Sequence, residues 1–354
     1  MTNEQTLEFL TTAANQHASD IFIIAGRPLS IKVDGHLTNH GERLMPDDTK
    51  QILESIYQMA NNRDLNRLLN TGDDDFSFSI PGLSRFRINA YKQRGSLAAV
   101  IRVIAFQLPD PSELSIPDDV MQTADYTKGM VLVTGSAGSG KSTTMACLID
   151  RINHSREGHI ITLEDPLEYL HRHDRCIVSQ REICTDTENY LTSLRATLRQ
   201  SPDVILLGEM RDHETIQTAM TAAETGHLVL SSLHTLGAAN SISRIIDVFE
   251  PAQQHQIIVQ LSMVLQAVIS QQLIPDVNGK VIPVFEVMRL TPAIRNMIRD
   301  NKLHQIEGVI ASSPQDQMRS MDHSLAELYK QGRIHKDTAI KYALNPDMIR
   351  HKLV

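Results

Sequence analysis

Cysteine is scarce in this sequence of 354 residues. The three cysteines, Cys147, Cys176 and Cys184, are odd in number and widely spaced, and no Cys-x-x-Cys pair occurs. Neither a disulfide framework nor a cysteine zinc site is therefore indicated. We expect all three to be reduced residues without a chemical role.

Long apolar runs are missing as well. No run approaches the roughly 18 residues of a membrane-spanning helix, and the first residues show no basic region followed by an apolar core. We therefore expect a cytoplasmic protein with no membrane span. The net charge of −8 argues against a dedicated nucleic-acid surface, because phosphate binding requires clustered Lys and Arg. A local basic channel inside a ring stays compatible with that charge.

The remaining composition, 41% hydrophobic and 21% charged, is that of a globular protein, and the length predicts about two domains. Residues 1–105 predict a small α+β domain with helices packed on an antiparallel sheet. Residues 106–117 hold three prolines and predict a linker. In 118–290, apolar runs alternate with helical stretches, which predicts an α/β domain with a largely parallel sheet. Residues 291–354 predict a helical tail. Strands of the second domain are expected at 131–134, 160–163, 204–207 and 228–233.

A glycine-rich stretch follows the first of these strands. It has the pattern Gly-x-x-x-x-Gly-Lys-Ser and precedes a helical stretch, which together are the context of a P-loop. Glycines let successive backbone N–H groups converge on a triphosphate. Lys141 would reach the β- and γ-phosphates of ATP, and Ser142 would offer a hydroxyl to Mg²⁺. The predicted ATP-binding residues are Gly135, Ser136, Ala137, Gly138, Ser139, Gly140, Lys141, Ser142 and Thr143.

Two further strands end in carboxylates. The run from Val204 ends at Glu209, the Walker B form that would hold Mg²⁺ together with Ser142. The run from Ile160 ends in an acidic box that contains Glu164 and Glu168. A carboxylate of this box would orient and deprotonate the attacking water, or the box would only cap the turn that follows.

Histidines and arginines complete the set of candidates. His227 and His234 flank one strand, about 23 Å apart, so they make a poor metal pair. Either one would sense the γ-phosphate or serve only in structure. In the first domain, the arginines of the alternating strands would be ordinary surface residues or, if that domain folds over the P-loop, would include an arginine finger. They are Arg85, Arg87, Arg94 and Arg102.

Four motifs in fixed order resemble the secretion ATPases of the type II and type IV systems. They are Gly135 to Ser142, Glu164-Asp165-Pro166-Leu167-Glu168, Gly208-Glu209-Met210-Arg211-Asp212, and the histidine box from Thr225 to Thr235. Within that superfamily the chain is similar to the PilT group, the retraction motors of type IV pili. The resemblance extends from 18–20 and 33–35 to 293–300, which is similar to the Ala-Ile-Arg-Asn-Leu-Ile-Arg-Glu motif associated with retraction.

This resemblance implies a PAS-like first domain, a RecA-like ATPase domain and a homohexameric ring. It also implies a seat at the inner face of the cell membrane, with the pilus platform protein and related pilus ATPases as partners. By the same resemblance Glu209 is the Walker B carboxylate, and Glu168, rather than Glu164, is slightly preferred as the base. His227 and His234 match the histidine-box positions, and Arg87 and Arg102 match arginines that reach the phosphates.

Some residues depart from the family pattern. Phe22 stands where many relatives have histidine, and Met297 and Asp300 replace Leu and Glu in the retraction motif. These changes leave room for an accessory retraction ATPase or a divergent paralogue. No four-cysteine zinc insertion is present, which argues against the extension and secretion branch. A secretion or DNA-transfer ATPase and a nucleotide-gated assembly module with little turnover are the alternatives.

Overall fold

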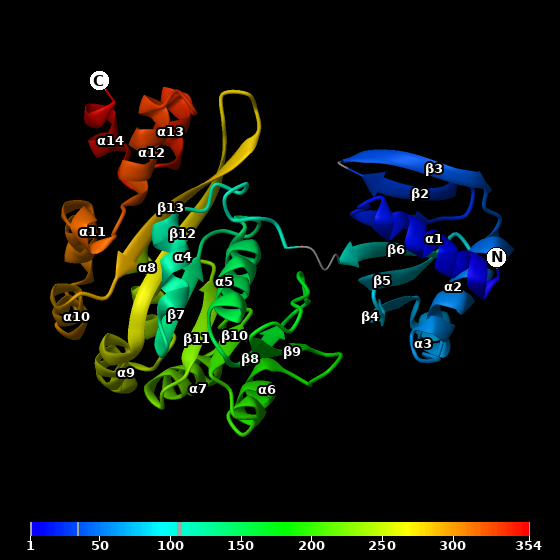
Figure 1. Cartoon of the computed structure of the whole chain (residues 1–354), viewed down its shortest axis with the longest axis horizontal. Helices are drawn as coiled ribbons and strands as arrows, with labels where there is room; N and C mark the ends of the chain where they lie inside the picture. The colour runs from blue at the N-terminus through cyan, green and yellow to red at the C-terminus, as the bar shows by residue number, and fades with distance from the viewer. Residues whose placement is uncertain (1, 34, 105–107, 354) are drawn as a thin grey trace. The chain divides into compact units, whose positions relative to one another are not determined.

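The computed structural model describes residues 2–33, 35–104 and 108–353. The chain divides into two compact units (Figure 1). The first comprises the residues up to Leu108 together with Glu168–Leu170, and the second comprises the other residues from Pro109 onward. Within the described residues, no helix is both long and apolar enough to cross a membrane.

The first unit is an antiparallel sheet of six strands in the order β3-β2-β1-β6-β5-β4. Alternate residues of these strands, such as Ile21 and Ile88, are buried in one core with Leu10 of α1 and Ile56 of α2. The two helices therefore cover one face of the sheet. The elements are α1 Asn3–Asn15, β1 Asp20–Ile23, β2 Pro28–Val33, β3 His36–Arg43, α2 Pro46–Met59, α3 Asn66–Thr71, β4 Asp73–Ile80, β5 Ser84–Gln93 and β6 Ser96–Ile104.

A buried carboxylate anchors α2 to β4. Asp74 accepts hydrogen bonds from Arg63 at 2.8 Å on each oxygen and from the Tyr57 hydroxyl at 2.9 Å. Burial alone would raise the pKa of Asp74, but the hydrogen bonds from Arg63 and Tyr57 and the charges of Arg63 and Arg67 outweigh it and hold that pKa below its usual value. The carboxylate therefore stays ionised although its side chain is fully buried.

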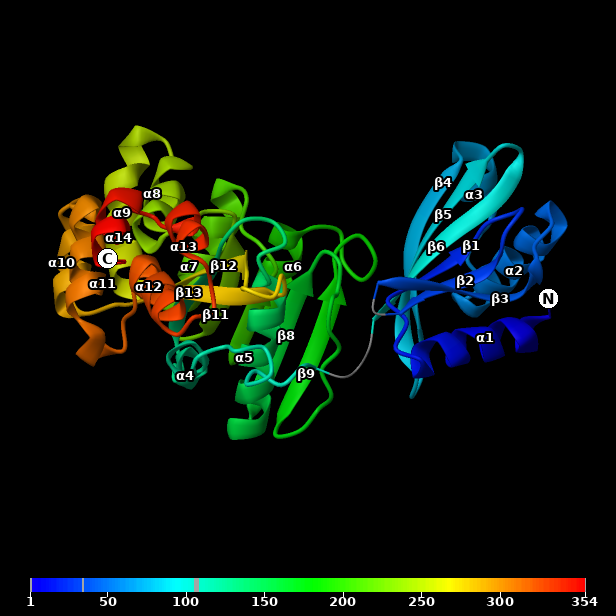
Figure 2. The ribbon, with the colours of Figure 1, turned by 90° about the horizontal axis from the view of Figure 1, so that it is seen from above.

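The second unit has a seven-stranded sheet in the order β13-β12-β7-β11-β10-β8-β9. Only the pairing of β12 with β13 is antiparallel. Figure 2 shows helices against this sheet, and its strands are apolar on both faces because both are covered. The elements are α4 Asp118–Met121, β7 Gly129–Thr134, α5 Lys141–Ser155, β8 Gly158–Glu164, β9 Cys176–Glu182, α6 Tyr190–Thr197, β10 Val204–Leu207, α7 His213–Glu224, β11 Leu228–Leu233, α8 Ala238–Asp247, α9 Pro251–Val264, β12 Leu265–Pro275 and β13 Val281–Arg289.

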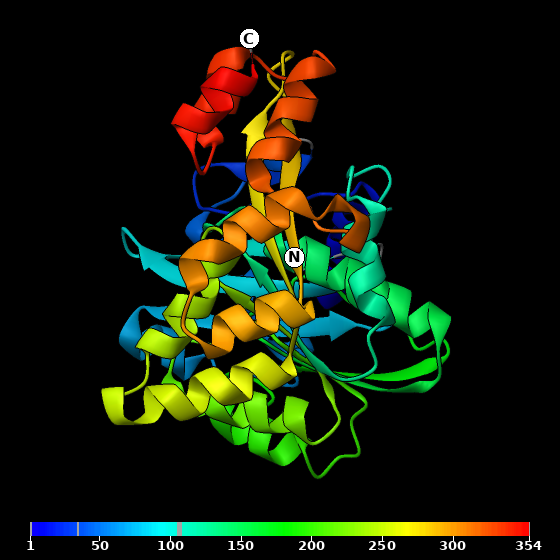
Figure 3. The ribbon, with the colours of Figure 1, turned by 90° about the vertical axis from the view of Figure 1, so that its left-hand side faces the viewer.

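The C-terminal helices follow the β12–β13 hairpin (Figure 3) and belong to two cores. Helix α10 (Pro292–Arg299) buries Ile294 and Ile298 in the core under α8 and α9, and α11 (Ile306–Ser312) extends that core. Helices α12 (Met321–Lys330), α13 (Lys336–Tyr342) and α14 (Pro346–Lys352) form a smaller core with the tip of the hairpin. The apolar stripe of the 293–300 segment thus packs within its own unit, while Arg295 and Asn296 stay exposed.

The predicted fold class is confirmed: a helix-covered antiparallel sheet precedes a mostly parallel α/β sheet. The predicted helical tail is present: Thr291 caps α10, and Gly332, at a φ of +69°, follows the end of α12. The prediction missed β9 and the β12–β13 hairpin. The segment 33–35 and the start of the predicted linker lie partly outside the described residues, because 34 and 105–107 are not among them.

Candidate nucleotide-binding and catalytic site

The phosphate loop, residues 135–140, connects β7 to the first turn of α5. Gly135, Gly138 and Gly140 have φ values of +149°, +73° and +86°, which side chains rarely adopt. A Cβ on Gly135 would lie 2.2 Å from the carbonyl oxygen of Gln271, so no larger residue fits there. The loop therefore forms a tight cradle that ends at a helix N-terminus, a geometry suited to phosphate.

Lys141 lies across this cradle. Its Nζ donates to the carbonyl oxygens of Gly135 and Ser136, each at 2.9 Å, and the residue is only 8% exposed. Nζ is also 3.5 Å from Nδ1 of His234. Among the other predicted binding residues, Ser142 and Thr143 are half-buried, and Ser139 is buried with a hydroxyl that has no hydrogen-bond partner. Lys141 is thus held at the mouth of the loop.

Glu209 follows β10 and faces the same place. Its Oε2 accepts from Nε of Arg211 at 2.8 Å and from Nε2 of His234 at 3.2 Å. The strand end is positioned by the Gly208 N–H, which donates to the Leu163 carbonyl at 2.8 Å. Glu209 is therefore connected to Lys141 through one imidazole.

His234 occupies the end of β11, the strand between β7 and β10. Its Nδ1 faces the Lys141 ammonium, which can only donate, and its Nε2 faces the Glu209 carboxylate, which can only accept. These contacts suit the tautomer that accepts at Nδ1 and donates from Nε2. His234 can thus link the residue beside the phosphate loop to the Walker B carboxylate.

The acidic box begins where β8 ends. Glu164 follows Leu163, which with Leu207 forms the last residue pair between β8 and β10, and the Cα of Glu164 lies 3.5 Å from where a Cβ on Gly208 would be. Glu168 is exposed, four residues further on, beyond a cis peptide bond between Asp165 and Pro166. The structure therefore places the backbone of Glu164 beside the Walker B turn.

His227 does not join this site. It precedes β11, so the whole strand of about 20 Å separates it from the end that carries His234. Its Nδ1 is 2.9 Å from the Ala222 carbonyl oxygen and 3.2 Å from the Thr225 hydroxyl. Within this chain His227 thus has local contacts at the end of α7, and its action at the nucleotide stays a prediction.

Arg87 and Arg102 lie in the first unit, directly opposite each other on β5 and β6. Arg87 forms an ion pair with Asp75 at 2.8 Å, and Arg102 is 3.5 Å from Asp20. Both project from the sheet face that α1 and α2 leave open, because the alternate residues are the buried ones. Their action on phosphate stays a prediction.

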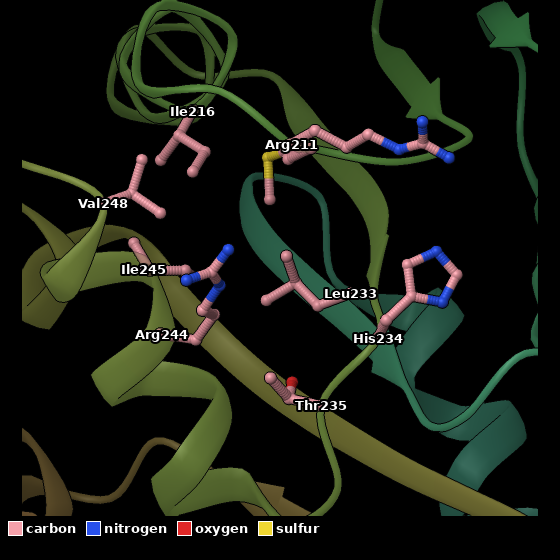
Figure 4. Close-up of a pocket in the computed structure, with 9 residues that line it drawn as sticks. Arg211, Ile216, Leu233, His234, Thr235, Arg244, Ile245 and Val248 are labelled. Atoms are coloured by element: carbon pink, nitrogen blue, oxygen red, sulfur yellow. The ribbon is translucent and has the colours of Figure 1, made fainter.

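A cavity of about 440 Å³ adjoins His234. In Figure 4, His234 and Arg211 lie on one side, while Arg244, Ile245 and Val248 of the α8 segment lie on the other. Its remaining wall is apolar and includes Ile216 and Leu233. This cavity lies behind the contact chain of Lys141, His234 and Glu209.

No group of three or more His, Cys, Asp or Glu side chains suited to a metal occurs in the described part of the chain. Proteins bind Mg²⁺ through one or two carboxylates together with the phosphates of a substrate. Ser142 at the start of α5 and Glu209 after β10 carry oxygen atoms of the kind that Mg²⁺ accepts as ligands. The contacts of Glu209 with Arg211 and with His234 both involve Oε2.

The sequence pattern of the family described as "Type II/IV secretion system protein" matches residues 3–281. The chain belongs to the type II/IV secretion ATPase family.

Two relatives and one solved structure show which members of the family are similar. The type IV pilus retraction ATPase PilT of Pseudomonas aeruginosa is 41% identical over 96% of this chain and 98% of its own length. The type IV pilus ATPase PilU of the same organism is 37% identical over 97% of this chain and 90% of its own length. A crystal structure of the pilus retraction motor PilT with bound ADP is 42% identical, covers 98% of both chains and has a TM-score of 0.88. The chain is therefore similar to the pilus ATPases PilT and PilU, as the resemblance predicted.

Sequence reasoning missed two residues of this secretion ATPase's site. Tyr190 lies with its hydroxyl 2.8 Å from where a Cβ on Gly208 would be. Burial raises its pKa, and the charges of Glu209, Asp165 and Glu164 add to the effect, so the phenol stays protonated among carboxylates. The other is Gln271, which contacts the phosphate loop from β12. Neither belongs to a recognisable local motif.

Proposed function

We propose that this chain is a Mg²⁺-dependent, ATP-hydrolysing motor that drives retraction of a type IV pilus. Two facts support the proposal. The chain matches a relative named as a retraction ATPase over nearly the full length of both proteins. The contact chain from Lys141 through His234 to Glu209 joins a phosphate-binding lysine to a metal-binding carboxylate, and this observation carries the catalytic part.

ATP would bind with its phosphates in the loop of residues 135–140. The backbone N–H groups of the loop and the N-terminus of α5 favour anions, and Lys141 adds a full positive charge near the β- and γ-phosphates. Ser142 and Glu209 would hold Mg²⁺, which when bound neutralises charge on the phosphate oxygens. His234 keeps Glu209 in place and can report the state of the γ-phosphate to it.

A carboxylate of the acidic box would accept the proton of the attacking water. The sequence slightly favoured Glu168, whereas the structure supports Glu164, because Glu164 adjoins Gly208 and Glu168 is exposed. Tyr190, whose hydroxyl lies beside Gly208, would help to position the carboxylates of Glu164 and Glu209. Intact carboxylates also argue against an assembly module that binds ATP with little turnover, since a pure binder has no use for a water-activating group.

In the family's terms the motor would be a homohexameric ring in which Arg87 and Arg102 reach the phosphates. Such a ring would work in the cytoplasm, at the inner face of the membrane, docked on the pilus platform protein. Related pilus ATPases would be further partners, and nucleic acid would not. The similarity to PilU supports an accessory retraction ATPase as the nearest alternative, and a secretion or DNA-transfer ATPase is the more distant one.

Variants in the exposed edge of α10 should distinguish pilus retraction from ATP hydrolysis. Arg295 and Asn296 point away from the buried stripe of Ile294 and Ile298 and lie far along the chain from the catalytic motifs. Replacement of both by alanine should leave ATP hydrolysis within about twofold while abolishing twitching, because this edge would transmit motion without contacting nucleotide.

Arg350→Ala, an exposed arginine on α14, is the matched control and should affect neither property. Loss of hydrolysis together with twitching would assign the edge to ring integrity. Normal twitching in the double variant would remove this support for a retraction motor.

A further inference from the structure

Gln271 contacts the phosphate loop from a strand that no nucleotide motif includes. It lies in β12, which pairs in parallel with β7, and the register Ser270–Thr134 places Gln271 beside the first residue of the loop. Gln271 is 3% exposed, so its amide group is removed from solvent. A buried amide requires hydrogen-bond partners, and Thr144 in the first turn of α5 supplies one of them.

One hydrogen bond and two close approaches bring Gln271 against the loop and α5. The Thr144 hydroxyl donates to Oε1 of Gln271 at 2.7 Å, and Thr144 is fully buried. Nε2 of Gln271 lies 2.8 Å from where a Cβ on Gly140 would be, and the Gln271 carbonyl oxygen lies 2.2 Å from the corresponding point on Gly135. One residue therefore touches both ends of the loop and the first turn of the helix.

The bond from Thr144 fixes the orientation of the amide. Because a hydroxyl donor faces Oε1, the NH₂ group is turned towards Gly140 and the backbone there. The partially positive end of the amide thus faces the segment that leads into Lys141. An apolar side chain of the same size would leave the buried Thr144 hydroxyl without this acceptor.

We propose that Gln271 is a positioning residue for nucleotide binding, which holds the phosphate loop in its binding shape through Thr144 and the backbone at Gly140. It acts through the loop and not on the reacting atoms. Its effect should fall on ground state and transition state alike, because the loop N–H groups hold phosphates in both. The proposed role of Gln271 presupposes that the chain hydrolyses ATP, as proposed above.

The test compares ATP hydrolysis by the full-length protein and by Gln271→Met, Thr144→Val and their combination. Each single variant should raise KM for ATP about tenfold and leave kcat within about threefold, since uniform binding is what is lost. A merely structural defect would instead lower the active fraction, and so kcat, with KM unchanged. Because the two side chains share one hydrogen bond, the combined variant should be no more than about twofold worse than Gln271→Met.

Gln272→Met is the matched control. The neighbouring Gln272 points to the other face of β12 and donates from Nε2 to the Tyr342 carbonyl at 2.9 Å. It should keep KM within about twofold of the wild type. Should Gln271→Met fail to fold, Thr144→Val decides alone, because it removes only the hydroxyl from the shared bond.

An unchanged KM in Thr144→Val, or fully additive effects in the combined variant, would overturn the role of Gln271. Absence of ATP hydrolysis in the wild-type protein would instead overturn the proposed function. The two failures are therefore distinguishable in one set of measurements.

Discussion

Glu286→Gln should destabilise the second unit, because Glu286 is a buried carboxylate that joins two helices distant in sequence. It is 2% exposed. Its Oε1 accepts from the N–H of Ala238 at 2.8 Å and its Oε2 from the N–H of Met321 at 3.3 Å. These are the first residues of α8, which follows the His234 loop, and of α12, in the C-terminal helices.

A glutamine has only one acceptor oxygen, so one of the two buried N–H groups would lose its partner. An unsatisfied buried donor costs about 1–3 kcal/mol, so the free energy of unfolding should fall by that amount at pH values where Glu286 is protonated. The difference should narrow as pH rises, because ionisation of the buried carboxyl costs only the wild type stability. This decrease in the free energy of unfolding measures how much Glu286 stabilises the connection between the loop after His234 and α12.

The pH dependence gives a second signature. Burial raises the pKa of Glu286 above its usual 4.5, the N–H groups of Ala238 and Met321 partly oppose this, and the charges of Glu307 and Asp322 add to it. The folded state therefore binds the proton more tightly than the unfolded chain does. Between pH 4.5 and the raised pKa, the stability of the wild type should fall as pH rises. Glu286→Gln has no such proton and should lack this decline.

Urea unfolding of the second unit, followed at several pH values, measures both effects. Glu157→Gln, an exposed glutamate of the same unit, is the control and should change stability by less than about 0.5 kcal/mol. Equal stability of Glu286→Gln and the wild type at every pH would refute the assignment of Glu286 as a double helix cap.

Three further predictions concern carboxylates and an arginine. Glu164→Gln should bind ATP but lower kcat by about 10²-fold or more, and Glu168→Gln should lower it less; the reverse order in steady-state kinetics would restore Glu168 as the base. Asp74→Asn should destabilise the first unit by about 3 kcal/mol or more, because it leaves Arg63 as a partly buried charge without its ionised partner. Since the pKa of Asp74 is lowered in the fold, the stability it confers should be present above the usual 3.8 and disappear as pH falls below it, which acid unfolding of this variant and the wild type would show. Arg87→Ala should lower kcat more than it weakens nucleotide binding, and an unchanged kcat would exclude the finger role.

Local sequence patterns were sufficient for much of the fold. Alternating residues in 76–104 and apolar runs after 131 identified the strands of both units, and Thr291-Pro292 identified the start of α10. The β12–β13 hairpin was missed because β12 directly follows Val264, the last residue of α9, without a turn residue between them. Its run from Leu265 to Pro275 does not alternate, so periodicity gave no signal.

The site was predictable only where its residues form a motif. Lys141 and Glu209 were predicted from the spacing of residues within their motifs. Their link through His234 could not be predicted in this way, because it depends on the strand order, in which β11 lies between β7 and β10. Gln271 reaches the loop because β12 pairs with β7, although the two are more than 100 residues apart in sequence. Such contacts depend on the pairing of distant strands, which no local pattern reports.

The most direct test of the central claim is made in cells that carry the type IV pilus served by this protein. A strain without the protein should be hyperpiliated and unable to twitch, and the wild-type gene should restore both properties. Lys141→Ala, which removes the charge that holds the β- and γ-phosphates, should restore neither. Normal piliation and twitching without the protein, or full restoration by Lys141→Ala, would contradict an ATP-driven retraction motor.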